Sequence, residues 1–265
     1  MVLEKLVPLK VALRNPWWMF LIGGIVSVIC LVVSFMVFKD SIGMFATLLI
    51  TIAMTPFMVN LARYEEAREE GLAGKDLNID LTIFQRYSGI LKVYTAFFCG
   101  MILSLSVIYV IIPEDTAKTL FKNQLDEITA IRGKATAIDT FQKIVANNIS
   151  VFFLSFLFSF LFGAGAIFIL AWNASVLSAA IGEVAKGIGG LHTLPLAVMM
   201  FFPHGSLEIL AYFIGGITGG IISAAITRKT SKKFWPIVFD SMKLMAVSIV
   251  LLLVAGGLEV AQMLF

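Results

Sequence analysis

Long uninterrupted apolar runs dominate this chain and limit what it can fold into. A helix of about 20 apolar residues crosses the roughly 30 Å hydrocarbon layer of a bilayer. Six runs reach about this length, at residues 17–38, 43–61, 91–112, 149–172, 204–226 and 244–264. Hydrophobic residues make up 59% of the 265 residues and charged residues only 14%, too apolar a mixture for a soluble core. The sequence therefore predicts an all-α, polytopic transmembrane helical bundle that has the lipid bilayer as a partner.

Charge and cysteine content exclude several other classes of protein. A net charge of +3 is too small to indicate a nucleic-acid partner. Cys30 and Cys99 both fall inside apolar runs, so we expect them to pack as small hydrophobic side chains. The basic N-terminus precedes the first run without a small-residue cleavage signature, and that run is expected to be retained as a span. No cofactor is predicted, and metal binding is left open.

Basic residues set the expected orientation in the membrane. Lys5, Lys10 and Arg14 precede the first run, which places the N-terminus in the cytoplasm of a multi-pass cell-membrane protein. Residues 62–90 and the basic cluster at 227–234 are then expected to be cytoplasmic, and residues 113–148 external.

This orientation conflicts with a simple count of six crossings. Three spans leave the chain outside, and the run at 149–172 returns it to the cytoplasm. A single crossing at 204–226 would then place the basic cluster outside. We therefore expect the short run "LPLAVMMFF" at 194–202 to form a broken or re-entrant half-helix before Pro203.

The external segment 113–148 reads as two amphipathic helices. Apolar residues recur at helical spacing in two sets, namely Phe121, Leu125 and Ile128, then Ile138, Phe141 and Ile144. The helices either lie on the membrane surface or pack against the ends of the spans. Two parts of the chain are expected: residues 1–92, a two-span hairpin with its cytoplasmic loop, and residues 93–265, a membrane domain.

A proline, a histidine and a glutamate lie where the fifth run begins, in "FFPHGSLEIL". His204 and Glu208 are four residues apart and share one face of a helix, and Gly205 between them permits close backbone approach. Charged side chains within a membrane are costly and normally face the bundle interior beside a partner. The pair is therefore a candidate proton or ion site, half of a metal site, or a buried polar lock. His192 is the only other histidine.

Other polar residues have weaker signals. Asn147 and Asn148 begin the fourth run and Asn173 ends it, so helix capping is expected more than ligand binding. Glu183 and Lys186 lie in "SAAIGEVAKGIGG", which is expected to be a re-entrant or interfacial helix, and solvated or interfacial roles are expected for both. Glu259 is close enough to the C-terminal end to reach water or a neighbour. A short helix carries Glu65, Glu66, Glu69 and Glu70, which form a solvated face or bind a cation or a basic partner.

Overlapping glycine pairs mark the segment "GGITGG". Gly215 pairs with Gly219, and Gly216 with Gly220, each pair separated by three residues. Small residues at this spacing let membrane helices approach closely, within or between chains. Tight helix packing is expected here, and a homo-oligomer or another membrane protein is an expected partner.

The segment "FQKIVANNISVFFLSFLFSFLFGAGAIFILAWNASVL", followed by "PHGSLEILAYFIGGITGG" and a basic loop, resembles the stage II sporulation protein M family. The residues that match the family pattern are Asn148, Asn173, His204, Gly205 and Glu208. Ala174 departs from it, because a glycine would be more familiar there. The resemblance covers roughly 138–262, and "ALRNPWWMFLIGG" with "RYEEAREE" is similar to archaeal members.

The resemblance implies an integral protein of the cell membrane, which in spore formers works with peptidoglycan hydrolases during engulfment. The leading hypothesis is a non-enzymatic scaffold or assembly partner. The alternative is a transporter or channel-like protein with a mid-membrane polar site at His204 and Glu208. An intramembrane metalloenzyme is a third hypothesis, and it needs a further ligand such as His192.

Overall fold

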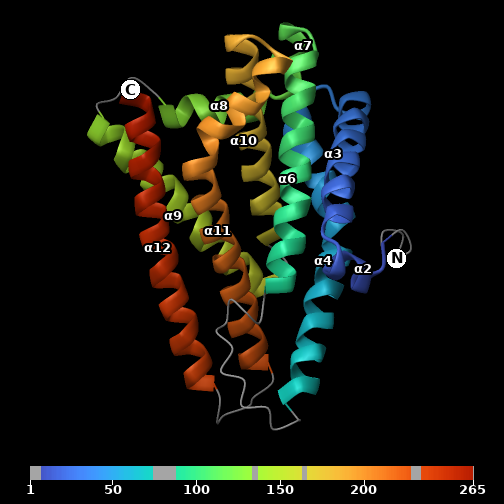
Figure 1. Ribbon diagram of the computed structural model, residues 1–265, viewed down its shortest axis with the longest axis vertical. Helices are drawn as coiled ribbons and strands as arrows, with labels where there is room; N and C mark the ends of the chain where they lie inside the picture. The colour runs from blue at the N-terminus through green and yellow to red at the C-terminus, as the bar shows by residue number, and fades with distance from the viewer. Residues whose placement is uncertain (1–6, 74–87, 133–136, 163–165, 228–233, 265) are drawn as a thin grey trace.

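The protein is described by a computed structural model over residues 7–73, 88–132, 137–162, 166–227 and 234–264 (Figure 1). All regular structure within these ranges is helical, as the sequence predicted. Seven helices contain segments apolar and long enough to cross a membrane: α3 (Trp17–Val37), α4 (Ile42–Ala73), α6 (Ser88–Ile111), α9 (Ala137–Phe162), α10 (Ala166–Ile188), α11 (Leu194–Thr227) and α12 (Phe234–Leu264). The shorter elements are α2 (Leu9–Arg14), α7 (Glu114–Leu120), α8 (Lys122–Arg132) and the 3₁₀ turn η1 (Leu191–Thr193).

The predicted single span at 149–172 is wrong, because this region contains two helices. α9 ends at Phe162 and α10 begins at Ala166, and the two run in opposite directions (Figure 1). The sequence carries a signal for this division in "FGAGAI", because glycine is a poor helix former. The stretch "SAAIGEVAKGI", expected to be re-entrant or interfacial, is instead the second half of α10.

The predicted half-helix at 194–202 is also wrong, because α11 continues through Pro203 as one helix. Proline removes the backbone hydrogen bond to the carbonyl of Met199. Gln262 of α12 donates to the adjacent carbonyl of Met200 at 2.7 Å, which ties α12 to this part of α11. With α10 as an extra crossing, the orientation conflict disappears without a break at Pro203. The basic cluster itself lies largely outside the described residues.

The segment after α6 covers one end of the bundle. α7 and α8 lie at this end, and α8 runs across the long helices (Figure 1). Phe121 and Ile128 are buried against the core, in agreement with the apolar spacing. The second expected amphipathic helix is not separate, because Ile138 and Ile144 belong to the first turns of α9.

A glutamine fixes α8 to the bundle. Gln124 is buried, and its amide donates to the hydroxyl of Ser175 on α10 at 3.2 Å. The same side chain lies over Gly43 of α4, where an added Cβ would collide with it. Polar side chains in low-dielectric surroundings need such partners, so this contact holds α8 in place.

The acidic stretch from Glu65 to Glu70 continues α4 and does not form a separate short helix. Its side chains lie outside the described residues. The division of the chain at residue 92 stays a prediction.

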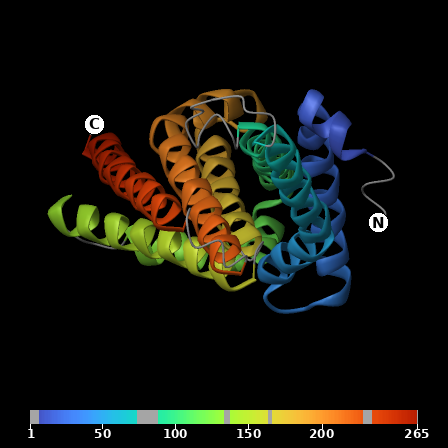
Figure 2. The same cartoon turned by 90° about the horizontal axis from the view of Figure 1, so that it is seen from below.

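Glycines set the closest helix contacts. At the crossing of α3 and α6, a Cβ on Gly23 would collide with the carbonyl of Phe97, and a Cβ on Gly100 with the carbonyl of Phe20. Viewed from below, α3 and α4 lie on one side of the molecule and α9 and α12 on the other, with α10 and α11 between them (Figure 2). The reciprocal glycines therefore join α3 to the rest of the bundle.

The glycine face of α11 packs within the chain, against α9. A Cβ on Gly215 would approach the carbonyl oxygen of Phe152 to 2.9 Å, and one on Gly219 would collide with the carbonyl of Phe156. Gly216 faces the methyl group of Ala166. These backbone contacts explain why small residues are needed on this face.

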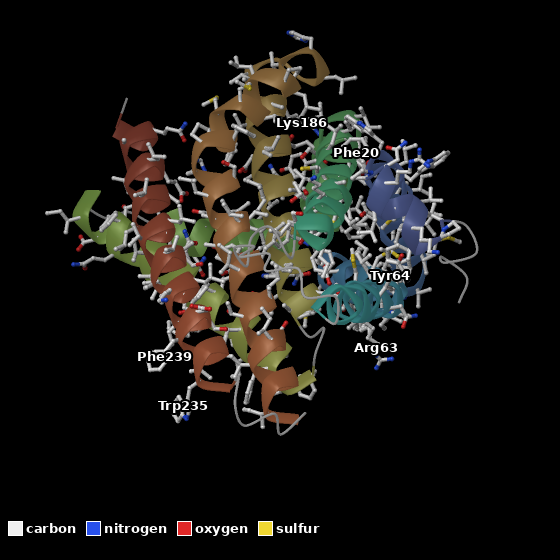
Figure 3. The ribbon with its side chains drawn as sticks, turned by 60° about the horizontal axis from the view of Figure 1, so that its bottom comes forward. Phe20, Arg63, Tyr64, Lys186, Trp235 and Phe239 are labelled. Atoms are coloured by element: carbon white, nitrogen blue, oxygen red, sulfur yellow. The ribbon has the colours of Figure 1, made fainter. Side chains whose placement is uncertain are left out.

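Lys186 binds carbonyl groups at the C-terminal end of α6 and does not simply face solvent. Its ammonium group donates to the carbonyl oxygens of Ile112 and Tyr109 and lies 3.8 Å from Glu114. A cation at a helix C-terminus binds carbonyls that lack intrahelical partners. Figure 3 shows Lys186 at this end of the bundle, whereas Trp235 projects outward at the opposite end.

The seven-helix topology makes a labelling prediction. In a background with Cys30→Ala and Cys99→Ala, the variants Leu191→Cys and Asp115→Cys should react with an impermeant thiol reagent from the same side of the membrane. Trp235→Cys should react only from the other side. If Leu191→Cys and Trp235→Cys instead reacted from the same side of the membrane, the result would support the six-span arrangement, in which η1 and the start of α12 share a side.

Two glycines of α11 should differ sharply on substitution by alanine. Gly219→Ala places a methyl group against the Phe156 backbone and should lower the free energy of unfolding by about 1–3 kcal/mol. Gly205→Ala is the matched control, because its Cβ would lie 3.5 Å from Leu177, an ordinary contact. Thermal unfolding of both variants in detergent measures the difference, and equal effects would contradict the role assigned to Gly219.

Candidate functional site

A cavity of about 100 Å³ lies among α9, α10, α11 and α12, with Ile128 of α8 in its wall. Apolar side chains form part of the lining. The polar part comes from four helices and comprises Asn147, Asn148, Asn173, His204, Glu208, Tyr212 and Glu259. Four of the five residues predicted as a polar site, Asn148, Asn173, His204 and Glu208, therefore meet at one place.

α11 supplies three polar groups at a spacing of four residues. His204, Glu208 and Tyr212 lie on one helical face and all line the cavity. Glu208 lies near the middle of the candidate span Leu191–Ser223. His204 is 5% exposed, and its ring packs beside Phe201 with 5.6 Å between ring centroids. The helical spacing alone explains this alignment, because α11 does not break at Pro203.

A hydrogen bond joins α9 to α11 within the cavity. The amide nitrogen of Asn148 donates to a carboxylate oxygen of Glu208 at 2.6 Å. Asn147 donates in turn to the amide oxygen of Asn148 at 3.4 Å. Asn148 is 5% exposed and lies in the interior of α9, so the expected capping role is wrong. Its partner is a carboxylate 60 residues away in the sequence.

Asn173 is also an interior residue and not a cap. It lies eight positions into α10, and its amide nitrogen donates to the backbone carbonyl of Ile169 in the same helix at 2.8 Å. This bond fixes the amide group while its side chain lines the cavity. The capping prediction was wrong because no helix ends at Asn173. The residue lies inside α10, which begins at Ala166.

Gly205 has a different position from the other predicted residues. It is buried, packs against Leu177, and is not among the residues that line the cavity. Leu177 is itself a lining residue, so Gly205 supports the wall behind it.

Glu259 of α12 also lines the cavity. It was expected to reach water or a neighbour, and the structure places it in the same lining as Glu208. A lone carboxylate inside "LLLVAGGLEVAQMLF" was an available signal, because acidic residues in a span usually face the bundle interior. Its pairing with Glu208 could not be read from the sequence, because the two belong to different helices.

His192 does not supply a third ligand for a metal centre at the cavity. This residue lies in η1, is exposed, and does not line the cavity. Across the described ranges, no three His, Cys, Asp or Glu residues are grouped closely enough to hold a metal ion.

The described residues form seven helices long and apolar enough to cross a membrane, and four of them line a polar cavity, so the class is an integral, multi-pass membrane protein. The family "Stage II sporulation protein M" matches residues 19–261, and the chain belongs to that family. An uncharacterised protein of Methanocaldococcus jannaschii is 30% identical over 125 residues, which cover 45% of this chain and 68% of that protein. This similarity agrees with an archaeal-type member. No solved structure matches the chain.

The hydrogen bond between Asn148 and Glu208 should appear as energetic coupling. Replacing Glu208 by alanine should destabilise the protein more than replacing it by glutamine, whose amide oxygen can still accept the hydrogen bond. In a double-mutant cycle, Asn148→Ala and Glu208→Ala should couple by roughly 0.5–3 kcal/mol. A second cycle should show coupling between His204→Ala and Glu208→Ala, because both side chains line the cavity.

Thermal unfolding in one detergent measures both cycles. Ser206→Ala is the control, because Ser206 is exposed on the same helix and does not line the cavity. Strictly additive losses for Asn148 and Glu208 would contradict the hydrogen-bonded arrangement.

Proposed function

We propose that this chain is a transport-type membrane protein and that the cavity is its solute site. The observation that carries the proposal is the convergence of polar groups from four helices near the middle of the α11 span. Polar and ionisable residues at such depth are costly, and they typically mark solute or ion pathways. A cavity of about 100 Å³ has room for a small solute or several waters.

The cavity walls suit a binding site. Val176, Ile209 and other apolar residues surround the polar groups, and small-molecule sites commonly combine apolar walls with a few polar groups that orient the ligand. The hydrogen bonds of Asn148 and Asn173 hold two of these groups in fixed positions. Preorganisation of this kind lowers the cost of binding.

The orientation follows from charge. We propose that the chain lies in the cell membrane with its N-terminus in the cytoplasm, because Lys10 and Arg14 precede α3. With seven crossings, the end of α11 and the start of α12 are then cytoplasmic, as suits the basic cluster between them. α7, α8 and η1 are external.

A scaffold or assembly role is the second candidate function. Family membership favours it, because the family is named for sporulation and the resemblance implies work with peptidoglycan hydrolases in spore formers. The glycine face of α11 lends it no support, because that face packs on α9. A homo-oligomer or a hetero-complex would need another surface.

Water access to the cavity separates these two functions. In the cysteine-free background, Val176→Cys places a thiol in the cavity wall, and a small cationic methanethiosulfonate reagent should modify it from the aqueous phase. Ser178→Cys is the matched control, because Ser178 lies two residues away on α10 and is fully buried outside the cavity. A transport-type protein should also show modification of Val176→Cys from both sides of the membrane, in right-side-out and inverted vesicles.

Failure of the reagent to reach Val176→Cys from either side would overturn the transport proposal. The polar cluster would then be a buried lock of a scaffold protein. Equal modification of Ser178→Cys would mean that the protein had opened generally, and the result would count against a defined solute path.

A further inference from the structure

The charge of the cavity restricts what can bind there. Glu208 from α11 and Glu259 from α12 both line it, together with His204, and the described lining residues include no lysine or arginine. Two carboxylates that share one low-dielectric site repel each other when both are ionised. Burial adds a desolvation cost to each charged group. A ligand with positive charge relieves both penalties.

The neutral groups around the carboxylates can also bind a cation. The amide nitrogen of Asn173 donates to the carbonyl of Ile169, which leaves its amide oxygen as an acceptor beside the cavity. Tyr212 adds a hydroxyl group to the lining. Carboxylate, amide and hydroxyl oxygens are the ligands that hard cations prefer.

Size and ligand number favour a single positive charge. A cavity of about 100 Å³ exceeds the space of one bare ion and suits an ammonium-sized group or a partly hydrated alkali-metal ion. Calcium takes 6–8 oxygen ligands and magnesium demands an octahedral set. The described part of the chain offers no group of three acidic, histidine or cysteine side chains for such an ion.

We propose that the cavity binds a small monovalent cation between Glu208 of α11 and Glu259 of α12. The inference rests on the solute site proposed above and names the class of solute that it takes. Glu259 is its specificity-determining residue, because it adds the second negative charge. One cation together with one proton, held by a carboxyl group or by His204, would balance both carboxylate charges.

The position of α12 gives the cation a measurable effect. α12 packs against α9 and α11, and only 22% of its candidate span is buried, the lowest share among the seven spans of the described residues. A cation held between Glu208 and Glu259 would add a link between α11 and α12. A ligand that binds only the folded state stabilises that state. At concentrations above Kd, the stabilisation grows with the logarithm of the ligand concentration.

Thermal unfolding of the purified full chain tests this link. The midpoint is measured in sodium, potassium, methylammonium or N-methylglucamine chloride at one pH and constant ionic strength. We expect at least one of the first three to raise the midpoint by about 3 °C or more at saturation, relative to the bulky N-methylglucamine. The comparison of sodium and potassium with methylammonium distinguishes an alkali-metal ion from an ammonium group.

The variants Glu208→Gln and Glu259→Gln should each abolish the cation-dependent rise. Glu114→Gln is the matched control, because this glutamate is exposed at the start of α7 and does not line the cavity. It should retain the full rise. Equilibrium binding of radioactive sodium, rubidium and methylammonium to the unmodified protein gives a second measurement that does not depend on the folding of any variant.

Several outcomes would overturn the cation site. The first is an unfolding midpoint that depends only on ionic strength, together with no binding of the radioactive cations. The second is an undiminished rise of the midpoint in both glutamine variants. The third is stronger stabilisation by magnesium or calcium than by any monovalent cation. A cavity open to the thiol reagent without a cation effect removes this inference and leaves the transport proposal. A cation effect in a cavity closed to the reagent leaves a structural ion and removes the transport proposal.

Discussion

Hydrocarbon offers no hydrogen-bond partner to a polar group, and the rest of this structure depends on that constraint. Helices satisfy the backbone within each segment. Many hydroxyl groups in the spans return to a carbonyl of their own helix, as Ser27 does to Gly23 and Ser178 to Ala174. Such residues can lie in a span without a partner from another helix.

Several longer polar side chains have partners on other helices, and these contacts gather at a few places. Gln124 reaches Ser175, Lys186 reaches the end of α6, and Asn148 reaches Glu208. The first two contacts fix elements at one end of the bundle and have a plain structural purpose. The third lies beside a cavity with further polar groups. Because of this difference, the contact between Asn148 and Glu208 is the one of the three that bears on function.

Glycine packing positions that contact. Gly215 and Gly219 bring α11 against the backbone of α9, on the next turns of α11 after Glu208. Because the two helices meet this closely, a short asparagine can span the distance to a glutamate. A larger residue on the glycine face would separate the helices and lengthen the same hydrogen bond. The family residues and the packing residues of "PHGSLEILAYFIGGITGG" therefore serve one arrangement.

The sequence by itself determined the all-helical membrane class, most of the spans, and the shared face of His204 and Glu208, because apolar length and helical spacing are local properties. It misjudged the region from 137 to 188, where apolar content continues across two helices and composition alone does not show the division. It also misjudged Asn148 and Asn173 as residues of helix ends, and it did not bring Glu259 together with them. Only the tertiary structure decided that these three share a cavity with Glu208, because the lining comes from several helices. No short-range pattern encodes a contact across 60 residues of sequence, such as that of Asn148 with Glu208.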